Sequence, residues 1–230
     1  FFTEVLNRKT RTRVFAITGD SGMGKSSLIA KLRERTQSQR LKNKVFIFAV
    51  DVRAATNANY VFASIISCLQ KAQSEGFGDA SLDIKITNAA DPLESPSIKN
   101  YLSTLEQSRQ IVCLIFDQFE ELYSKPVLFD IFDVAQRLFL SVTAIQSNIV
   151  LGFAWKSDAM VPQSHPAYFM WHSLSDHRLQ IELQRFKHDE ASAAITLFEK
   201  ELGQKLLQNL RRQLLESTQG YPWWLKKLSI

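Results

Sequence analysis

Apolar and polar positions follow two different periods along the chain, and short apolar runs alternate with longer amphipathic segments. Short, mostly apolar runs bounded by polar residues are typical of strands buried in a parallel sheet. They predict strands at 14–18, 44–50, 111–117, 148–155 and 178–183. The last run, RLQIEL, alternates between polar and apolar residues, so we expect it at an edge of the sheet.

Apolar residues spaced three and four apart predict helices between these strands. The segments with this spacing are 26–35, a stretch that begins at Asn57, 95–107 and 126–146. In contrast, 74–91 and 156–175 show little periodicity and are expected to be irregular. From residue 188 onward the pattern is helical alone, over 189–202, 204–217 and 222–230. Strands separated by helices predict a doubly wound α/β core at 1–185, and the change near residue 185 predicts a helical lobe at 186–230.

The junction between the first predicted strand and its helix carries the sequence GDSGMGKS, which matches the phosphate-binding loop pattern G-x-x-x-x-G-K-[ST]. Glycines allow backbone N–H groups to close around a polyphosphate, and the helix N-terminus adds positive potential. We expect Lys25 to reach the β- and γ-phosphates and the Ser26 hydroxyl to ligate Mg²⁺. The nucleotide-binding residues predicted here are Gly19, Asp20, Ser21, Gly22, Met23, Gly24, Lys25, Ser26 and Ser27.

A second element for nucleotide chemistry follows the apolar run at 111–117, which ends on an acid. Asp117, at the end of this buried strand, is expected to hold the Mg²⁺ hydration shell next to Ser26. Glu120 and Glu121 are both close enough to orient and partly deprotonate an attacking water, and the sequence does not choose between them. The alternative interpretation of this pair is a charged helix start, where acids suit the helix dipole.

The run that ends in Asp117-Gln118-Phe119-Glu120-Glu121-Leu122 resembles the Walker B region of STAND-type P-loop ATPases, relatives of the AAA+ class that include the NACHT proteins. Two further stretches are similar to that family. LGFAWKSD has the shape of its sensor region after the fourth strand, with Lys156 where the family has arginine. Lysine keeps the charge but loses the planar bidentate fork. Gly220-Tyr221-Pro222 resembles the G-x-P motif of the helical lobe, whose proline packs near the nucleotide base.

This resemblance implies a five-stranded parallel P-loop NTPase core with a C-terminal helical lobe that is a truncated AAA+-like lid. It implies ATP and Mg²⁺ as cofactors, ATPase activity, self-association in the ATP-bound form, and effector and sensor domains outside this chain. We expect turnover to be slow, because Lys156 would stabilise transition-state charge less well than arginine. Many prokaryotic relatives serve in antiviral defence. The sequence contains no guanine-reading N-K-x-D motif, which favours adenine. Two alternatives stay open: a nucleotide-binding module without hydrolysis, and an AAA+-like ATPase that acts on DNA.

Composition narrows the classes of partner. The net charge of +5 comes with basic clusters at 8–13, 211–212 and 226–227, none interleaved with aromatic residues, so nucleic acid is not the favoured partner. No apolar run approaches the roughly 18 residues of a membrane span. Cys68 and Cys113 lie in apolar stretches and are expected to be buried free thiols of a cytoplasmic protein. Because the chain starts at Phe1 and ends after a helical run, we expect a domain of a longer polypeptide.

Several other residues are weaker candidates. They include Arg13 and Arg53. Arg53 follows the second strand and could point over the ligand cleft, although a surface role is favoured for it. The resemblance implies that the basic segment at 8–11 runs past the base and ribose. The tryptophans and their aromatic neighbours are expected to be buried, except that one of Trp223 and Trp224 is expected to face an adjoining domain.

Overall fold

A computed structural model describes residues 1–38, 41–156 and 161–228. Its centre is one sheet of five strands in the order β2-β3-β4-β1-β5, and every neighbouring pair is parallel. The strands are β1 Val14–Thr18, β2 Val45–Asp51, β3 Ile111–Asp117, β4 Ile149–Trp155 and β5 Arg178–Glu182. The predicted five-stranded parallel α/β fold is therefore confirmed, and β5 lies at an edge as its alternating pattern indicated.

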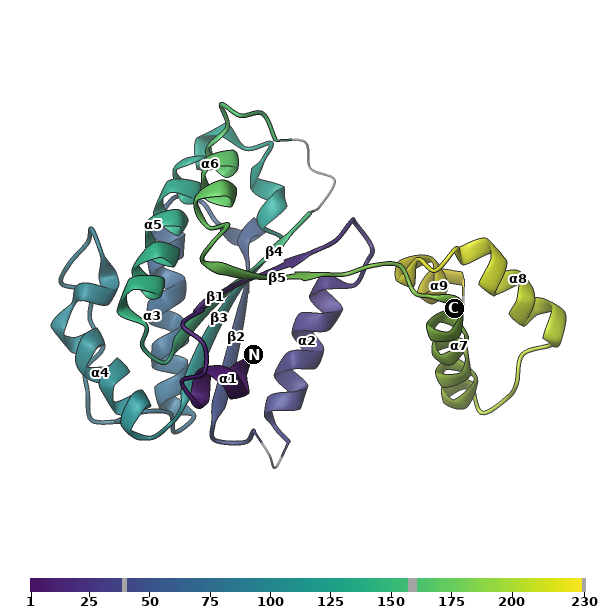
Figure 1. The fold of residues 1–230 in the computed structure, drawn as a ribbon, viewed down its shortest axis with the longest axis horizontal. Helices are drawn as coiled ribbons and strands as arrows, with labels where there is room; N and C mark the ends of the chain where they lie inside the picture. Colours follow the sequence, from purple (N-terminus) through teal and green to yellow (C-terminus); the bar gives the residue numbers. More distant parts are fainter. Residues whose placement is uncertain (39–40, 157–160, 229–230) are drawn as a thin grey trace.

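Helices cover both faces of this sheet (Figure 1). One layer consists of α1 Phe2–Leu6 and α2 Lys25–Thr36. The opposite layer consists of α3 Asn59–Ser74, α4 Pro96–Gln107, α5 Asp130–Ile145 and α6 Pro166–Ser173. Short 3-10 turns occur at Val52–Ala54, Pro92–Glu94, Phe119–Leu122 and Pro126–Leu128.

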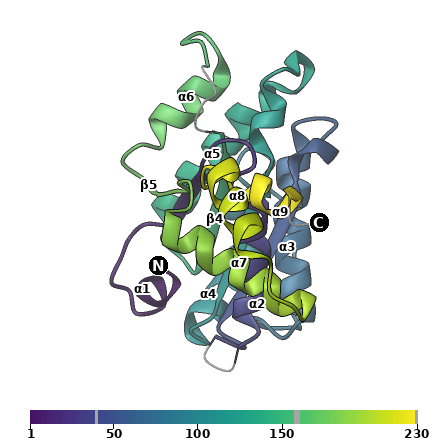
Figure 2. The same cartoon turned by 90° about the vertical axis from the view of Figure 1, so that its right-hand side faces the viewer.

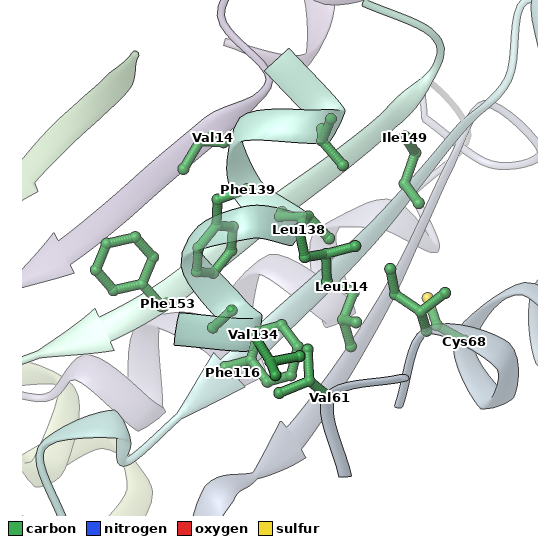
Figure 3. Packing of buried hydrophobic residues seen from close by; sticks show 14 of the residues in the cluster. Val14, Val61, Cys68, Leu114, Phe116, Val134, Leu138, Phe139, Ile149 and Phe153 are labelled. Atoms are coloured by element: carbon green, nitrogen blue, oxygen red, sulfur yellow. The ribbon is translucent and has the colours of Figure 1, made fainter. Parts of the chain in front are cut away.

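The core follows from the alternation of side chains along each strand. In β1, Val14 and Ala16 face the layer of α3 to α6, whereas Phe15 and Ile17 face α1 and α2. Figure 3 shows Phe139 of α5 packed near Phe153 of β4 on the first of these faces. The two apolar layers fix the sheet from both sides, so the carboxyl ends of the strands form a rigid edge on which a site can be built.

The C-terminal helices α7 His188–Leu202, α8 Gln208–Thr218 and α9 Pro222–Leu228 stand apart from the α/β core, beyond α2 (Figures 1 and 2). They share a small apolar cluster of Ile195, Leu214 and Leu225. The segment after β5 joins them to the core. Phe186 in this segment donates its N–H to the Gly220 carbonyl at 2.8 Å, which ties the connection to the start of α9.

Three predicted segments differ from the structure. The helix expected over 204–217 spans Gln208–Thr218. The helix expected over 126–146 begins at Asp130, because Pro126 starts a separate 3-10 turn. The segment 156–175, expected to be irregular, contains α6, which His165 and Pro166 start in the manner of an N-cap and first helical residue. Phe169 was expected to be buried, but it lies on the outer side of this short helix and is 56% exposed.

The structure also describes the surroundings of the two cysteines. Cys68 and Cys113 are buried free thiols, as expected. Burial raises the pKa of both thiols far above the ordinary value, because a thiolate would lose its hydration there. Within the described ranges, none of the helices combines the length and apolar character needed to cross a membrane.

Candidate nucleotide-binding site

The phosphate-binding loop connects the end of β1 to the first turn of α2. Gly22 and Gly24 both have positive φ angles, of 82° and 90°, which glycine adopts without a steric penalty. Gly24 is the N-cap of α2, so the loop delivers its backbone directly onto the helix N-terminus. This is the arrangement that favours an anion, because free N–H groups and the positive end of the helix dipole face the same point.

Lys25 is buried at the base of this loop, with 7% of its surface exposed. Its ammonium donates to the Gly19 carbonyl at 2.9 Å and to the Asp20 carbonyl at 3.4 Å. A third partner is Glu120, whose Oε1 lies 3.3 Å from Nζ. The ammonium therefore has two hydrogen bonds and an ion pair within the protein, and an entering phosphate would have to compete with them.

The residues after β3 reach the loop from across the sheet. β4 lies between β1 and β3, yet Gln118 Nε2 donates to Ser26 Oγ at 3.2 Å. Gln118 has a φ of 61°, a left-handed conformation that costs a residue with a Cβ about 1–2 kcal/mol. Asp117 supports it, because Asp117 Oδ1 accepts the Gln118 N–H at 2.9 Å. This strained conformation changes the direction of the chain at the end of β3, and Glu120 comes to lie beside the loop.

The two candidate glutamates have different surroundings. They belong to the 3-10 turn Phe119–Leu122, in which Phe119 and Leu122 are buried. Glu120 points inward with 11% of its side chain exposed, whereas Glu121 is exposed to solvent. The second carboxylate oxygen of Glu120, Oε2, is buried and has no hydrogen-bond partner. The geometry therefore favours Glu120 over Glu121 as the group that acts on a bound nucleotide.

Helix α9 closes the other side of the loop. Trp223 donates its backbone N–H to the Gly22 carbonyl at 3.2 Å, and a Cβ added to Gly22 would lie 2.9 Å from the Trp223 Cβ. A pocket of about 260 Å³ lies between these parts. Its lining comes from the loop, from the turn after β3 and from α9: Ser21, Gly22, Gly24, Lys25, Ser26, Ser27, Gln118, Glu120, Pro222 and Trp223.

The side chains present fit a magnesium-bound phosphate. Hard cations such as Mg²⁺ prefer oxygen ligands, and the Ser26 hydroxyl lines the pocket. The Asp117 carboxylate, at the end of β3, accepts the N–H of Gln118, whose side-chain amide donates to that hydroxyl. A Cβ added at Gly24 would meet nothing closer than 4.0 Å, so the space beside this glycine is open. Ser26 would hold the ion directly, and Asp117 would hold one of its water ligands.

Some predicted residues lie elsewhere. Arg13 is wrong as a ligand candidate, because it is buried at the amino end of β1. There it donates to the Ser147 carbonyl at 2.7 Å, to Gln146 and to two residues of its own segment. Arg8 lies 3.7 Å from Glu106 of α4, also far from the loop, so a path of this residue past the base is not supported.

Arg53 and Lys156 lie at the carboxyl edge of the sheet but outside the lining of the pocket, as far as the structure describes it. Arg53 is exposed and binds Asp51 at the end of β2, and this contact lowers the pKa of the Asp51 carboxyl. Lys156 directly follows β4 and is partly buried. The rest of its predicted sensor motif, at 157–158, falls outside the described residues.

Sequence reasoning missed two residues of the site. Gln118 lies inside the acidic motif, but the sequence suggested no role for it. Its contact with Ser26 depends on its left-handed backbone, which the sequence does not predict. Trp223 was assigned to packing or to an adjoining domain, whereas it contacts the loop and is 46% exposed. The signal available for Trp223 was its position directly after the proline of the G-x-P motif.

The sheet, the glycine loop and the acid after β3 define a P-loop NTPase. The chain belongs to the family described as Novel STAND NTPase 1, whose model matches residues 1–229. Comparison with curated proteins found no match.

Solved structures resemble the whole chain at low identity. The Aeropyrum pernix ORC1 protein in complex with DNA has a TM-score of 0.58 at 14% identity, over 99% of this chain and 56% of that one. A Walker-type ATPase of Pyrococcus abyssi has a TM-score of 0.57 at 17% identity, over 97% and 64%. The Aeropyrum pernix ORC2 protein, in ADPNP and ADP complexes, gives 0.55 at 16%, over 99% and 58%. The chain thus spans little more than half the length of these proteins.

Proposed function

We propose that this chain binds Mg-ATP between its α/β core and its helical lobe and hydrolyses it slowly. The observation that carries the proposal is the convergence on one loop of Lys25, Ser26 and Glu120, which come from two separate parts of the sequence. If the glycine loop were a chance match, nothing would favour its contact with an acid from the turn after β3. Membership of an NTPase family and the nucleotide complexes of the ORC2 neighbour support the same conclusion.

Each side chain has a defined task in this proposal. The loop N–H groups and Lys25 bind the β- and γ-phosphates and orient the terminal phosphoryl group for attack from the side of Glu120. Magnesium, when bound, neutralises phosphate charge. Glu120 accepts the proton of the attacking water, and Gln118 holds the Ser26 hydroxyl in place through its amide. Closure by Pro222 and Trp223 excludes bulk water from the pocket.

The proposal of slow turnover rests on Lys156. This residue follows β4, where the family carries a sensor arginine. An ammonium offers a point charge instead of a planar fork, so it stabilises the charge that develops on the γ-phosphate less well. Substitution Lys156→Arg is therefore expected to increase the hydrolysis rate.

The contact between α9 and the loop supports a switch. Because Trp223 bonds to Gly22, any movement of the loop around a phosphate is transmitted to the lobe of α7 to α9. We propose that residues 1–185 and 186–230 act as core and lid, and that ATP binding to this pair drives self-association. The wider role, with effector and sensor domains beyond this chain and a place in prokaryotic antiviral defence, is proposed from the family alone.

The test is phosphate release by the wild type, Lys25→Ala, Glu120→Gln and Glu121→Gln, with nucleotide binding measured in parallel. We expect loss of binding in Lys25→Ala. In Glu120→Gln we expect lost turnover with binding tighter than that of the wild type, because the carboxylate that competes for Lys25 is gone. Normal turnover in Glu120→Gln together with a loss in Glu121→Gln would move the catalytic role to Glu121. Tight binding without release by the wild type would instead support a module that does not hydrolyse ATP.

Action on DNA is the second candidate, favoured by two observations. The formal charge is +5, and the ORC1 neighbour was solved in complex with DNA. Binding to nucleic acid through phosphate contacts weakens steeply as salt increases. Fluorescence anisotropy of a labelled DNA duplex between 50 and 200 mM salt tests this candidate, and the favoured proposal predicts no salt-dependent complex at micromolar protein.

A further inference from the structure

Next to Glu120 along the chain begins an aromatic cluster with two polar side chains, Tyr123 and His165, that the proposed chemistry does not use. Three atoms there are buried and have no hydrogen-bond partner: Glu120 Oε2, Tyr123 Oη and His165 Nε2. Buried polar atoms are almost always hydrogen-bonded, because an unpaired atom has lost its hydrogen bonds to water without gaining a replacement. Three such atoms on neighbouring side chains call for a common explanation.

Tyr123 stands on the same side of its turn as Glu120. The Tyr123 N–H donates to the Glu120 carbonyl at 3.1 Å, at the end of the 3-10 turn Phe119–Leu122. In 3-10 geometry, side chains three residues apart are eclipsed, so Tyr123 and Glu120 extend from the same side of the turn. Its ring is fixed edge-on to Trp155, with centroids 5.2 Å apart, and stacked near Phe132, with centroids 6.0 Å apart.

His165 approaches Tyr123 from another element. Its ring centroid lies 6.0 Å from that of Tyr123, and it caps α6 because its Nδ1 accepts the Ala167 N–H at 3.0 Å. An Nδ1 that accepts a hydrogen bond carries no proton, so the neutral ring holds its proton on Nε2. His165 therefore presents a buried N–H donor to the cluster.

The three atoms are complementary in hydrogen bonding. His165 Nε2 can only donate, the Tyr123 hydroxyl can accept and donate, and Glu120 Oε2 can only accept. In the structure, Glu120 is turned toward Lys25, which holds its other oxygen. A phosphate that takes the Lys25 ammonium removes this partner, and the Tyr123 hydroxyl is an unpaired donor on the same side of the turn.

We propose that Tyr123 is a positioning residue, whose hydroxyl accepts a hydrogen bond from His165 Nε2 and donates one to Glu120 once Lys25 binds the phosphates. Glu120 thus exchanges one partner for another: Lys25 before phosphate binds, and the Tyr123 hydroxyl afterwards. The inference rests on the proposed ATPase function. Burial, together with the Glu120 carboxylate, raises the pKa of Tyr123 well above its usual range, which keeps the phenol protonated as a donor.

The relay also connects two parts of the site. His165 starts α6, whereas Glu120 and Tyr123 belong to the turn after β3, so the proposed relay joins two separate parts of the chain. Within the described residues, neither Tyr123 nor His165 lines the pocket at the phosphate loop. Loss of the relay should therefore lower turnover without weakening nucleotide binding.

The experiment compares Tyr123→Phe and His165→Asn with the wild type. Phenylalanine keeps the ring and its packing, and asparagine keeps the helix cap while removing the Nε2 donor. Tyr101→Phe is the matched control, since it removes another buried hydroxyl, the one bonded to the Phe77 carbonyl at 2.7 Å. For both relay variants we expect kcat to fall on the order of tenfold, with an unchanged dissociation constant for ATP.

A second readout separates positioning from damage to the fold. A hydrogen bond to a carboxylate favours its charged form, so Tyr123→Phe should move the acid limb of the kcat–pH profile to higher pH. The same shift should appear in a carboxylate ¹³C NMR titration of Glu120 with a non-hydrolysable ATP analogue bound, assigned through Glu120→Gln. Tyr101→Phe should lower the melting temperature and leave both titrations in place.

An unchanged kcat and an unchanged Glu120 titration in Tyr123→Phe would overturn the proposal, as would equal effects of Tyr101→Phe. If the wild type binds the analogue but releases no phosphate, hydrolysis itself fails. The NMR titration then still decides whether Tyr123 holds Glu120. If the analogue does not bind, both proposals fail together.

Discussion

Replacing Glu120 by glutamine separates the stability of the nucleotide-free protein from its affinity for ATP. Glu120 Oε1 lies 3.3 Å from Lys25 Nζ, and both side chains are almost fully buried. At an effective dielectric constant of about 20, the gross attraction between the two charges is about 5 kcal/mol. Desolvation of the two groups offsets much of this attraction.

The net effect is smaller because glutamine keeps an acceptor oxygen. A charge-assisted hydrogen bond contributes about 1.5–3 kcal/mol, and a neutral one about 0.5–1.5 kcal/mol. Lys25 also retains the carbonyls of Gly19 and Asp20. We therefore expect Glu120→Gln to lower the free energy of unfolding by about 1–2 kcal/mol without nucleotide.

The same change should strengthen ATP binding. A phosphate no longer competes with a carboxylate for Lys25, and the loss in the free protein becomes a gain in the complex. A gain of about 1–2 kcal/mol corresponds to roughly 5- to 30-fold tighter binding. Turnover should fall by about 10²-fold or more, since the proton acceptor is gone.

Urea unfolding and calorimetric titration with ATP measure the two quantities, and Glu121→Gln is the matched control. Glu121 is exposed, so its substitution should change stability by no more than about 0.5 kcal/mol and leave affinity unchanged. The reasoning is refuted if Glu120→Gln is as stable as the wild type and binds ATP no more tightly, or if Glu121→Gln reproduces its effects.

Three further predictions follow from the fold. Gly152→Ala should destabilise the protein by several kcal/mol in urea unfolding, on the order of 3, because the new Cβ would lie 2.3 Å from the Phe15 ring in the adjacent strand. Arg13→Lys should cost about 2–3 kcal/mol and leave ATP affinity unchanged, since one ammonium cannot serve the carbonyls that the guanidinium binds. Stability should fall as pH rises above about 9, because the unfolded chain releases the Cys68 and Cys113 protons near their ordinary pKa of about 8.5 while the folded chain holds them. Cys68→Ala with Cys113→Val should flatten that slope in pH-dependent thermal unfolding, and a slope that does not change would contradict it.

The strands could be predicted because each is a compact apolar run with a distinct end. The segment 111–117 was placed with the bounds that the structure has, since both faces of β3 are covered and no residue of it needs to be polar before Asp117. The helix α6 was missed although His165-Pro166 gives the same start signal that placed α4 at Ser95-Pro96. The helix spans only eight residues and most of them are apolar or aromatic, so no helical spacing of apolar and polar positions could be recognised.

The site could be predicted in kind but not in detail. A motif fixes which residues bind a phosphate, so Lys25 and Ser26 were evident. The choice between Glu120 and Glu121 depends on how the short turn after β3 is rotated. The left-handed backbone of Gln118 sets this rotation, and no residue pattern in the sequence predicts that conformation. The approach of Trp223 to Gly22 joins residues about 200 positions apart, and only the assembled lobe and core bring them together.

The central claim is that Lys25 binds the phosphates of ATP, and equilibrium binding of a non-hydrolysable ATP analogue with Mg²⁺ tests it most directly. The comparison is between the wild type, Lys25→Ala and Lys31→Ala. Lys31 is an exposed lysine of the same helix, paired with Glu34 at 2.8 Å. The account predicts micromolar or tighter binding by the wild type and by Lys31→Ala, and a loss of about 100-fold or more in Lys25→Ala. Equal affinities of the wild type and Lys25→Ala would contradict it.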